Sequence, residues 1–384
     1  MATRTVLGFA AVVGGAAILA AGCSDPLSPR GSSVGVPVFA TTAPTGAPIT
    51  LDQNNGSLAA ANTAVLLKGF NPTNPHTGDA IVATFFWTGS TNIITGVIDH
   101  LANGTPVGNT YTLVDYHTAG GLSMATYVAI NVQNFPDAYG VPGGAQDSIL
   151  AIEADLSQPV SHGGVQITAY TGVGSVAALA LGAHASTDGT GSGITPLGPA
   201  PVPVGAGTLV HAVALTNGIF GYDLPAGFGD VGEGDNAVMK EDAADFVASG
   251  VGTVQPQWNW YYDAGSYSWL ATAITLSPPP HLVFTTPPVT TLPLLTMASV
   301  RASAMDGFGN VVTGFTDAVT IAIGKNGGVV MPGTLSGTLT VTAVNGVASF
   351  SNLSIDQPGN GYTLVVSTPR AVSKESAPFN IGAL

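Results

Sequence analysis

Short runs in which apolar and polar residues alternate recur along most of this chain, and glycine, asparagine, aspartate or proline separates nearly all of them. A period of two residues is typical of β-strands with one buried face, and the separating residues favour tight turns. The sequence contains 51 glycines and 27 prolines, while only 8% of its residues are charged. Because long surface helices and coiled coils need many Glu, Lys and Arg side chains, the pattern predicts an all-β protein.

The pattern is clearest in residues 281–384. Asn345 and Gly346 separate two alternating runs and supply the two positive φ angles that a type I′ hairpin turn requires. Residues 306–310, Asp-Gly-Phe-Gly-Asn, form a second predicted turn. About seven strands in about a hundred residues is the density of an immunoglobulin-like β-sandwich. Six runs are candidates for these strands: 281–285, 299–305, 318–323, 335–344, 347–350 and 362–368.

Three motifs in this region resemble the bacterial immunoglobulin-like repeats of invasin- and intimin-type surface proteins. They are Ala-Met-Asp-Gly-Phe-Gly-Asn-Val-Val at 304–312, Gly-Val-Ala-Ser-Phe at 346–350 and Gly-Tyr-Thr-Leu at 361–364. The resemblance implies a spacer or adhesive module without catalytic residues. It also implies a tyrosine corner at Tyr362, in which the hydroxyl ties the incoming loop to the strand.

The region 51–277 is predicted to form one large sandwich of the jelly-roll kind, and the three prolines at 278–280 form a short, semi-rigid hinge after it. Few windows show a helical period, and 238–249 is the best of them. Segments such as 78–83, 108–113 and 269–274 loosely resemble an uncharacterised sandwich domain of secreted bacterial proteins, which implies no activity. The predicted strands are 80–87, 93–99, 110–114, 123–132, 149–155, 165–170, 177–185, 208–214 and 267–276.

Residues 1–22 have the organisation of an export signal, with a positive charge at Arg4, an apolar stretch and small residues at the end. They are followed by Cys23, the single cysteine of the chain. Leu-Ala-Ala-Gly-Cys at 19–23 resembles the lipobox of bacterial lipoproteins, which implies cleavage before Cys23 and a diacylglycerol anchor on its thiol. In such lipoproteins an Asp directly after the cysteine favours retention at the inner membrane, so the resemblance together with Ser24 implies the outer membrane or cell surface. A transmembrane anchor is the alternative.

Residues 23–50 are rich in proline and small polar residues, which bury too little surface to order a chain. They are predicted to form a flexible tether. The whole sequence carries 22 acidic and 8 basic residues and a formal charge of −14. So few basic side chains cannot neutralise many phosphates, which argues against nucleic acid as a partner.

An acidic segment between Asp223 and Asp245 contains seven carboxylates and one lysine, Lys240. Oxygen ligands spaced by glycines suit Ca²⁺, so Asp230, Glu233 and Asp235 are candidate calcium ligands. The alternative is a solvated acidic loop followed by a short helix. No other cofactor is predicted.

A cluster of aromatic residues follows, and within it Trp258 and Trp260 alternate along a short run. Residues two apart share one face of a strand, and exposed aromatic rings on such a face stack sugars in many carbohydrate-binding modules. The two tryptophans are therefore candidates for a sugar platform. Core packing is the alternative.

Catalytic motifs are absent from the sequence: it has no Gly-x-Ser-x-Gly elbow and no His-Glu-x-x-His. Its seven histidines are scattered, so a zinc site would need ligands that converge in space. The sequence predicts a non-enzymatic, lipid-anchored envelope protein with an adhesin-like or spacer surface and a glycan or surface protein as its ligand. The alternatives are a carbohydrate-binding surface protein and a secreted hydrolase with an accessory immunoglobulin-like domain, for which Glu153 and Asp155 are candidate acids.

Overall fold

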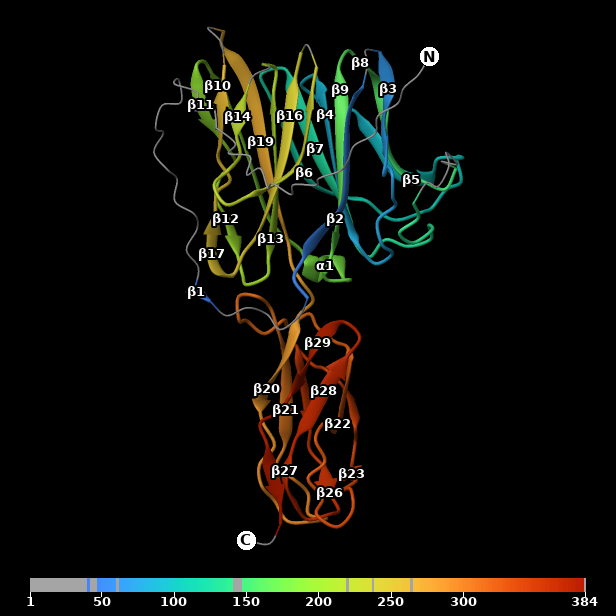
Figure 1. The fold of residues 1–384 in the computed structure, drawn as a ribbon, viewed down its shortest axis with the longest axis vertical. Helices are drawn as coiled ribbons and strands as arrows, with labels where there is room; N and C mark the ends of the chain where they lie inside the picture. Colours follow the sequence, from blue (N-terminus) through green and yellow to red (C-terminus); the bar gives the residue numbers. More distant parts are fainter. Residues whose placement is uncertain are drawn as a thin grey trace, which may run out of the picture. The chain divides into compact units, whose positions relative to one another are not determined.

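The computed structural model describes residues 40–41, 47–59, 62–140, 147–218, 221–236, 238–262 and 265–382. The predicted signal peptide, Cys23 and most of the predicted tether lie outside these ranges. Nearly all regular structure in the described ranges is β-strand, and the one helix there is α1 (Ala177–Ala180). The all-β prediction is confirmed (Figure 1). None of the helical structure in these ranges has the length and apolar character needed to cross a bilayer.

Residues 50–171 form a sandwich of two antiparallel sheets. The larger, inner sheet has the order β2-β9-β4-β7-β6, and the smaller, outer sheet has the order β3-β8-β5. The first strand, β2, pairs with the last, β9, and the second strand, β3, pairs with the one before the last, β8. This is the jelly-roll order expected from the sequence. The strands are β2 (Thr50–Ala59), β3 (Thr63–Gly69), β4 (Ala80–Thr88), β5 (Ile94–Leu101), β6 (Thr112–Ala119), β7 (Leu122–Ala129), β8 (Leu150–Val160) and β9 (Gly163–Thr171).

Residues 181–276 repeat this order, so the region predicted as one jelly-roll sandwich contains two. The second inner sheet runs β10-β19-β13-β16-β15, and its outer layer consists of two short sheets, β11-β18-β14 and β12-β17, the latter extended by β1 (Ala40–Thr41). The strands are β10 (Leu181–Gly191), β11 (Ile194–Leu197), β12 (Val202–Val204), β13 (Leu209–Thr216), β14 (Tyr222–Asp223), β15 (Gly229–Asp235), β16 (Lys240–Val247), β17 (Gly250–Val254), β18 (Trp258–Tyr261) and β19 (Tyr267–Leu276).

The two inner sheets pack face to face and share a core. Val82 and Val128 of the first half lie in one cluster of buried residues with Leu209 and Ile274 of the second. Strands β4, β9, β13 and β19 are therefore buried on both faces over nearly their whole length. Such strands read as continuous apolar runs, because neither face meets water.

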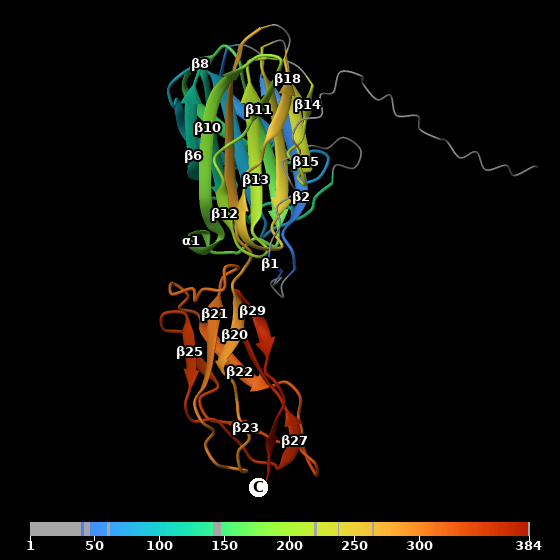
Figure 2. The ribbon, with the colours of Figure 1, turned by 90° about the vertical axis from the view of Figure 1, so that its left-hand side faces the viewer.

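The edges of the inner sheets also meet in equivalent pairs (Figure 2). β6 lies beside β10, and β2 lies beside β15. Two histidine–carboxylate contacts join β6 to β10: Nε2 of His117 is 2.9 Å from Oδ1 of Asp188, and Nδ1 of His184 is 3.2 Å from Oδ1 of Asp115. The two jelly rolls consequently form one body.

One predicted strand, 177–185, begins instead with the single turn α1 and becomes β10 only at Leu181. Alanine has the highest helix propensity, and 177–180 reads Ala-Ala-Leu-Ala. The prediction of a strand is therefore wrong for residues 177–180.

Residues 281–381 form a further β-sandwich with its own core of buried residues. The predicted turn at Asn345 and Gly346 is confirmed, because their φ angles are 50° and 79° and Val344 and Val347 exchange backbone hydrogen bonds around it. The predicted hairpin extends no further than this pair, since residues 340–342 pair with 318–320 and residues 347–350 pair with 300–303. The predicted turn at 306–310 is confirmed too, since Oδ1 of Asp306 accepts hydrogen bonds from the backbone N–H groups of Phe308 and Asn310. The strands are β20 (His281–Thr286), β21 (Val300–Met305), β22 (Ala318–Ile323), β23 (Leu335–Ser336), β24 (Thr340–Thr342), β25 (Val347–Phe350), β26 (Ser354–Ile355), β27 (Gly359–Tyr362), β28 (Leu364–Thr368), β29 (Ala371–Glu375) and β30 (Phe379–Ile381).

Tyr362 makes the contact expected of a tyrosine corner. Its side chain is fully buried, and its hydroxyl donates a hydrogen bond of 3.0 Å to the backbone carbonyl of Gln357, five residues earlier. We expect Tyr362→Phe to lower the free energy of unfolding of this sandwich by about 1 kcal/mol, because the carbonyl loses its donor while the ring packing is kept. Urea unfolding of the full-length protein measures the change, and an unaltered midpoint would contradict this role.

Candidate functional site

Trp258 and Trp260 are fully buried, so the predicted sugar platform is wrong. The two rings lie on the same face of β18, as their spacing predicted, but that face covers the inner sheet of the second half. They pack in one cluster with Val210, Ala212 and Ala273. Neither ring presents a face to solvent on which a sugar can stack.

The acidic segment forms two paired strands in place of the predicted loop and helix. Residues 240–247 of the predicted helix form β16, which pairs with β13 on one side and β15 on the other. Asp230, Glu233 and Asp235 lie on β15, where Nζ of Lys240 donates to Glu233 at 2.7 Å and lies 3.9 Å from Asp235. The structure therefore directs two of the three candidate calcium ligands toward a lysine.

Two further carboxyls of this segment are buried in β16. Glu241 is 1% exposed and Asp242 is not exposed at all. Burial raises the pKa of Asp242 to about 7, although Nε1 of Trp258 donates a hydrogen bond to it. Burial raises the pKa of Glu241 as well, and the neighbouring Asp242 adds to the effect. Both side chains belong to the packed interior and offer no ligand site.

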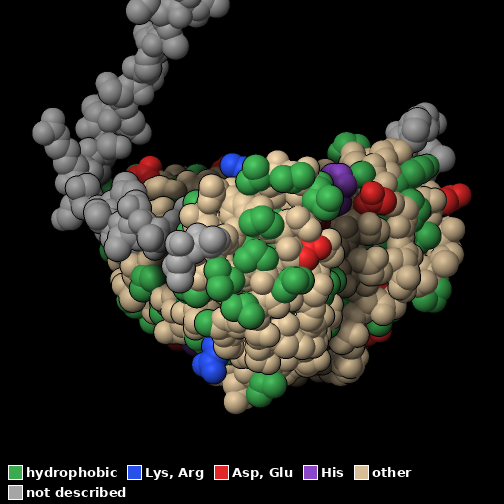
Figure 3. Space-filling view, turned by 90° about the horizontal axis from the view of Figure 1, so that it is seen from below, with side chains coloured by type: hydrophobic (Ala, Val, Ile, Leu, Met, Phe, Trp, Pro, Cys, Tyr) green, Lys and Arg blue, Asp and Glu red, His purple; other side chains and the backbone are tan. Residues whose placement is uncertain are grey.

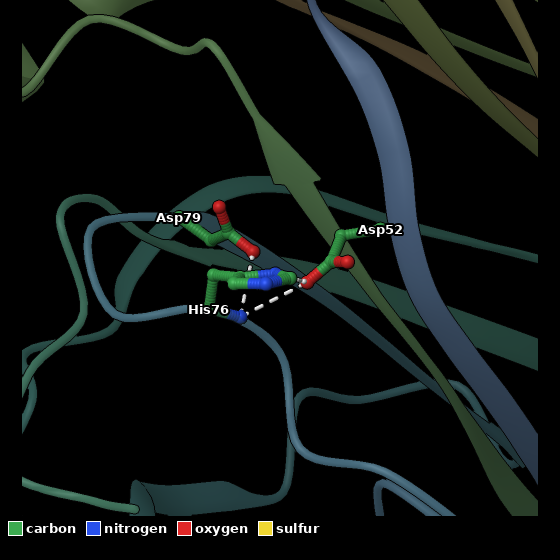
Figure 4. Close-up of side chains that lie close together, drawn as sticks. All are labelled: Asp52, His76 and Asp79. Carbon is green, nitrogen blue, oxygen red and sulfur yellow. Dashed lines mark hydrogen bonds and ion pairs between the residues drawn. The ribbon is translucent and has the colours of Figure 1, made fainter. Parts of the chain in front are cut away.

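Asp52, His76 and Asp79 form the one group of three acidic or imidazole side chains, within the described ranges, whose ligand atoms lie close enough to hold one ion (Figure 4). Oδ2 of Asp52 is 3.0 Å from Nδ1 of His76 and accepts the backbone N–H of His76 at 2.9 Å. Oδ2 of Asp79 accepts the same N–H at 3.1 Å. The two carboxylates therefore converge on one residue.

Local structure explains how these side chains meet. In the pairing of β2 with β9, Leu51 is opposite Tyr170 and Gln53 is opposite Ala169, so Asp52 is the extra residue of a β-bulge. A bulge redirects a side chain away from the regular alternation of the strand. His76 lies in the loop between β3 and β4, and Asp79 directly precedes β4.

The site is strongly acidic. Burial, together with the neighbouring Asp52 carboxylate, raises the pKa of Asp79 to about 7. The hydrogen bond and the charge of Asp52 raise the pKa of His76 above its ordinary value. A further carboxylate, Asp137, accepts hydrogen bonds from the backbone and the hydroxyl of Thr77, and the backbone contact lowers the pKa of Asp137.

A cavity of about 410 Å³ lies on the first jelly roll, beside β5 and the loop that follows it. His100 and Glu153 line it, with Nε2 of the imidazole 3.1 Å from Oε2 of the carboxylate. Asp99 also lines it, but its two oxygens accept hydrogen bonds from the backbone N–H groups of Gly108 and Asn109 and from the Asn109 side chain. The role of Asp99 is therefore to hold the loop.

The same cavity bears on the hydrolase alternative. Glu153, one of the two candidate acids, lines the cavity, while Asp155, the other, is exposed and is not among the lining residues. Of the two acids proposed from the sequence, the cavity therefore includes only Glu153, whose partner is His100.

No protein-family model matches this sequence, and no curated protein matches it either. Among solved structures, the chain is similar to one described as "Biofilm associated protein - BSP domain". The two share 10% identity over 93% of this chain and 84% of the other, with a TM-score of 0.17. So low a TM-score carries no argument about fold or function, and the lipoprotein and invasin-type resemblances stay predictions.

The sequence offered little sign of the Asp52, His76 and Asp79 group. Each residue stands in a different segment, and no spacing typical of metal ligands connects them. The only usable signal was Gly78-Asp79 directly before an apolar run, which marks an acidic side chain at the beginning of a strand.

Proposed function

We propose that this chain is a non-enzymatic, lipid-anchored protein of the bacterial cell envelope that presents a rigid binding or spacer surface. One observation carries the proposal: Leu19 and the small residues at 20–22 stand directly before Cys23, the single cysteine, at the end of an export-signal pattern. The tether pattern at 23–50 follows, and then the folded β-sandwiches. Ser24 supports the outer membrane or the cell surface as the location.

The fold supports a presenting role. Two jelly rolls joined through a shared core make a stiff body, and function on stiff scaffolds commonly resides in loops. The cavity beside His100 and Glu153 is bordered by such a loop and is the concave feature that we assign to ligand binding. On the face seen in Figure 3, few charged side chains stand among hydrophobic and uncharged atoms, which suits a glycan or protein ligand better than nucleic acid.

Mass spectrometry of the N-terminal peptide from protein made in a lipoprotein-processing bacterium tests the proposal. We expect a mature chain that begins at Cys23 and carries a diacylglyceryl group, in the membrane fraction. Cys23→Ala should abolish the acylation and leave the leader uncleaved, because the thiol is the attachment point. Ser24→Ala is the matched control and should keep the lipid. A chain with its leader intact in the cytosol, or membrane attachment that survives Cys23→Ala, would refute the proposal.

A further inference from the structure

Three separate segments bring one imidazole and two carboxylates to the beginning of the first inner sheet (Figure 4). Asp52 comes from the bulge in β2, His76 from the loop between β3 and β4, and Asp79 from the residue before β4. One ligand atom from each side chain lies within 4.8 Å of the other two. The fold, and not a local sequence motif, makes this group.

The donor set fits a divalent transition-metal ion. Imidazole nitrogen suits Zn²⁺ and its neighbours in the first row, and carboxylate oxygens complete the shell of such an ion. Zinc–ligand bonds of about 2.0–2.2 Å place the ligand atoms of one tetrahedral ion roughly 3.3 Å apart. Nδ1 of His76 and Oδ2 of Asp52 are 3.0 Å apart, so they already stand near that spacing.

Asp79 is a buried carboxyl without a lysine or arginine partner in the described ranges; the groups that face it are His76 and the carboxyl of Asp52. Its side chain is 3% exposed, and the backbone N–H of His76 is the donor that reaches it. Buried carboxylates are usually paired with a cation or bound to a metal. Within the described ranges the ion pairs of lysine and arginine are those of Lys240 and Arg370, and neither involves this site.

Three other histidines also lie next to a carboxylate, and they provide an internal comparison. His100 contacts Glu153, His117 contacts Asp188 and His184 contacts Asp115, at 2.9–3.2 Å. Each of these pairs has a single carboxylate, whereas His76 has two that point toward it. The difference is the second, buried carboxylate, Asp79.

We propose that Asp52, His76 and Asp79 bind one divalent transition-metal ion, with Zn²⁺ preferred and water in the remaining coordination positions. The ion joins the beginning of β2 to the β3–β4 loop and to β4. Its structural use rests on the proposed function: in a chain held at Cys23, a pull on the tether reaches the folded part first at β1 and next at β2, the strand that the ion would hold to the β3–β4 loop and β4.

Calorimetric titration of the purified, EDTA-treated full-length protein with Zn²⁺ tests this site. We expect one ion per chain, and a thermal midpoint that rises by roughly 5 °C at a hundredfold excess of Zn²⁺ over its Kd. Asp52→Asn, His76→Ala and Asp79→Asn should each weaken binding by at least about tenfold, because each removes a ligand. His100→Ala is the matched control and should leave the affinity unchanged.

Absence of Zn²⁺ binding would overturn the proposal, and so would an affinity that His76→Ala does not change. His76 is more than half exposed, so its replacement tests the site even if Asp79→Asn fails to fold. Tighter binding of Ca²⁺ or Mg²⁺ than of Zn²⁺ would refute the transition-metal assignment. The result is independent of lipidation, because an unacylated Cys23 would refute the proposed function and leave the titration as it stands.

Discussion

Replacing Trp258 or Trp260 with alanine is expected to lower the free energy of unfolding by about 3–5 kcal/mol. Both indoles are fully buried between the outer layer and the inner sheet of the second half, so truncation leaves a large cavity there. Trp258→Ala also deprives the buried Asp242 of a hydrogen-bond donor, which adds to the loss. Urea unfolding followed by circular dichroism measures both changes.

Val251→Ala provides the control, because this side chain on β17 is 48% exposed and its truncation should change the stability by no more than about 0.5 kcal/mol. Losses below about 1 kcal/mol for both tryptophan variants would mean that the rings are accessible. Such a result would restore the sugar platform as a hypothesis.

Raising the pH from 4 to 8 is expected to destabilise the protein by about 4 kcal/mol relative to its Asp242→Asn variant. In the folded state the pKa of Asp242 is raised from 3.8 to about 7, mainly because burial disfavours its ionised form. Between these two values the folded state binds more protons than the unfolded state, so stability falls as the pH rises. Asparagine does not ionise, and its contribution is therefore constant over this range.

The comparison must be between variants, since other buried groups titrate in the same range. Burial lowers the pKa of His211 to about 4, so this group removes stability as the pH falls from about 6.5 toward 4. Urea midpoints of the wild type and Asp242→Asn, measured in half-unit pH steps, isolate the one carboxyl. Asp147→Asn, at an exposed position before β8, should follow the wild-type curve. Parallel curves for the wild type and Asp242→Asn would contradict the assignment.

The sequence predicted those strands that meet water on one side or carry an unbroken apolar run. Alternation identified β5 and β20, and apolar runs identified β4 and β19. The turn at Asn345 and Gly346 was predictable from chemistry alone, because positive φ angles at two successive residues select these residue types. The presence of two jelly rolls could not be predicted from the sequence, because the two halves share a strand order but no recognisable sequence repeat.

Strand β16 shows where the pattern fails. It begins Lys240-Glu241-Asp242, three charged residues that are all buried. Local sequence assigns such residues to solvent, and only the second sheet that packs over them places them inside. The same cause explains Trp258 and Trp260: their shared face was predicted correctly, but whether that face meets water depends on which layer covers it.

The candidate metal site was beyond sequence reasoning for a related reason. The bulge that redirects Asp52 and the loop that carries His76 toward Asp79 are products of the tertiary fold. The scattered histidines indicated only that a zinc site would need ligands that converge in space. They did not indicate which of them had two acids within reach.

The core shared by the two inner sheets has a consequence for how this protein can be divided and expressed. The inner sheet of each jelly roll has an apolar face that the other jelly roll covers. Val82 of the first half and Ile274 of the second, for example, are buried in one cluster. Cutting the chain near residue 175 would expose these apolar faces in both fragments. We expect the fragments to aggregate, since large exposed apolar patches drive association. The two jelly rolls are therefore expected to be expressed and to fold as one unit.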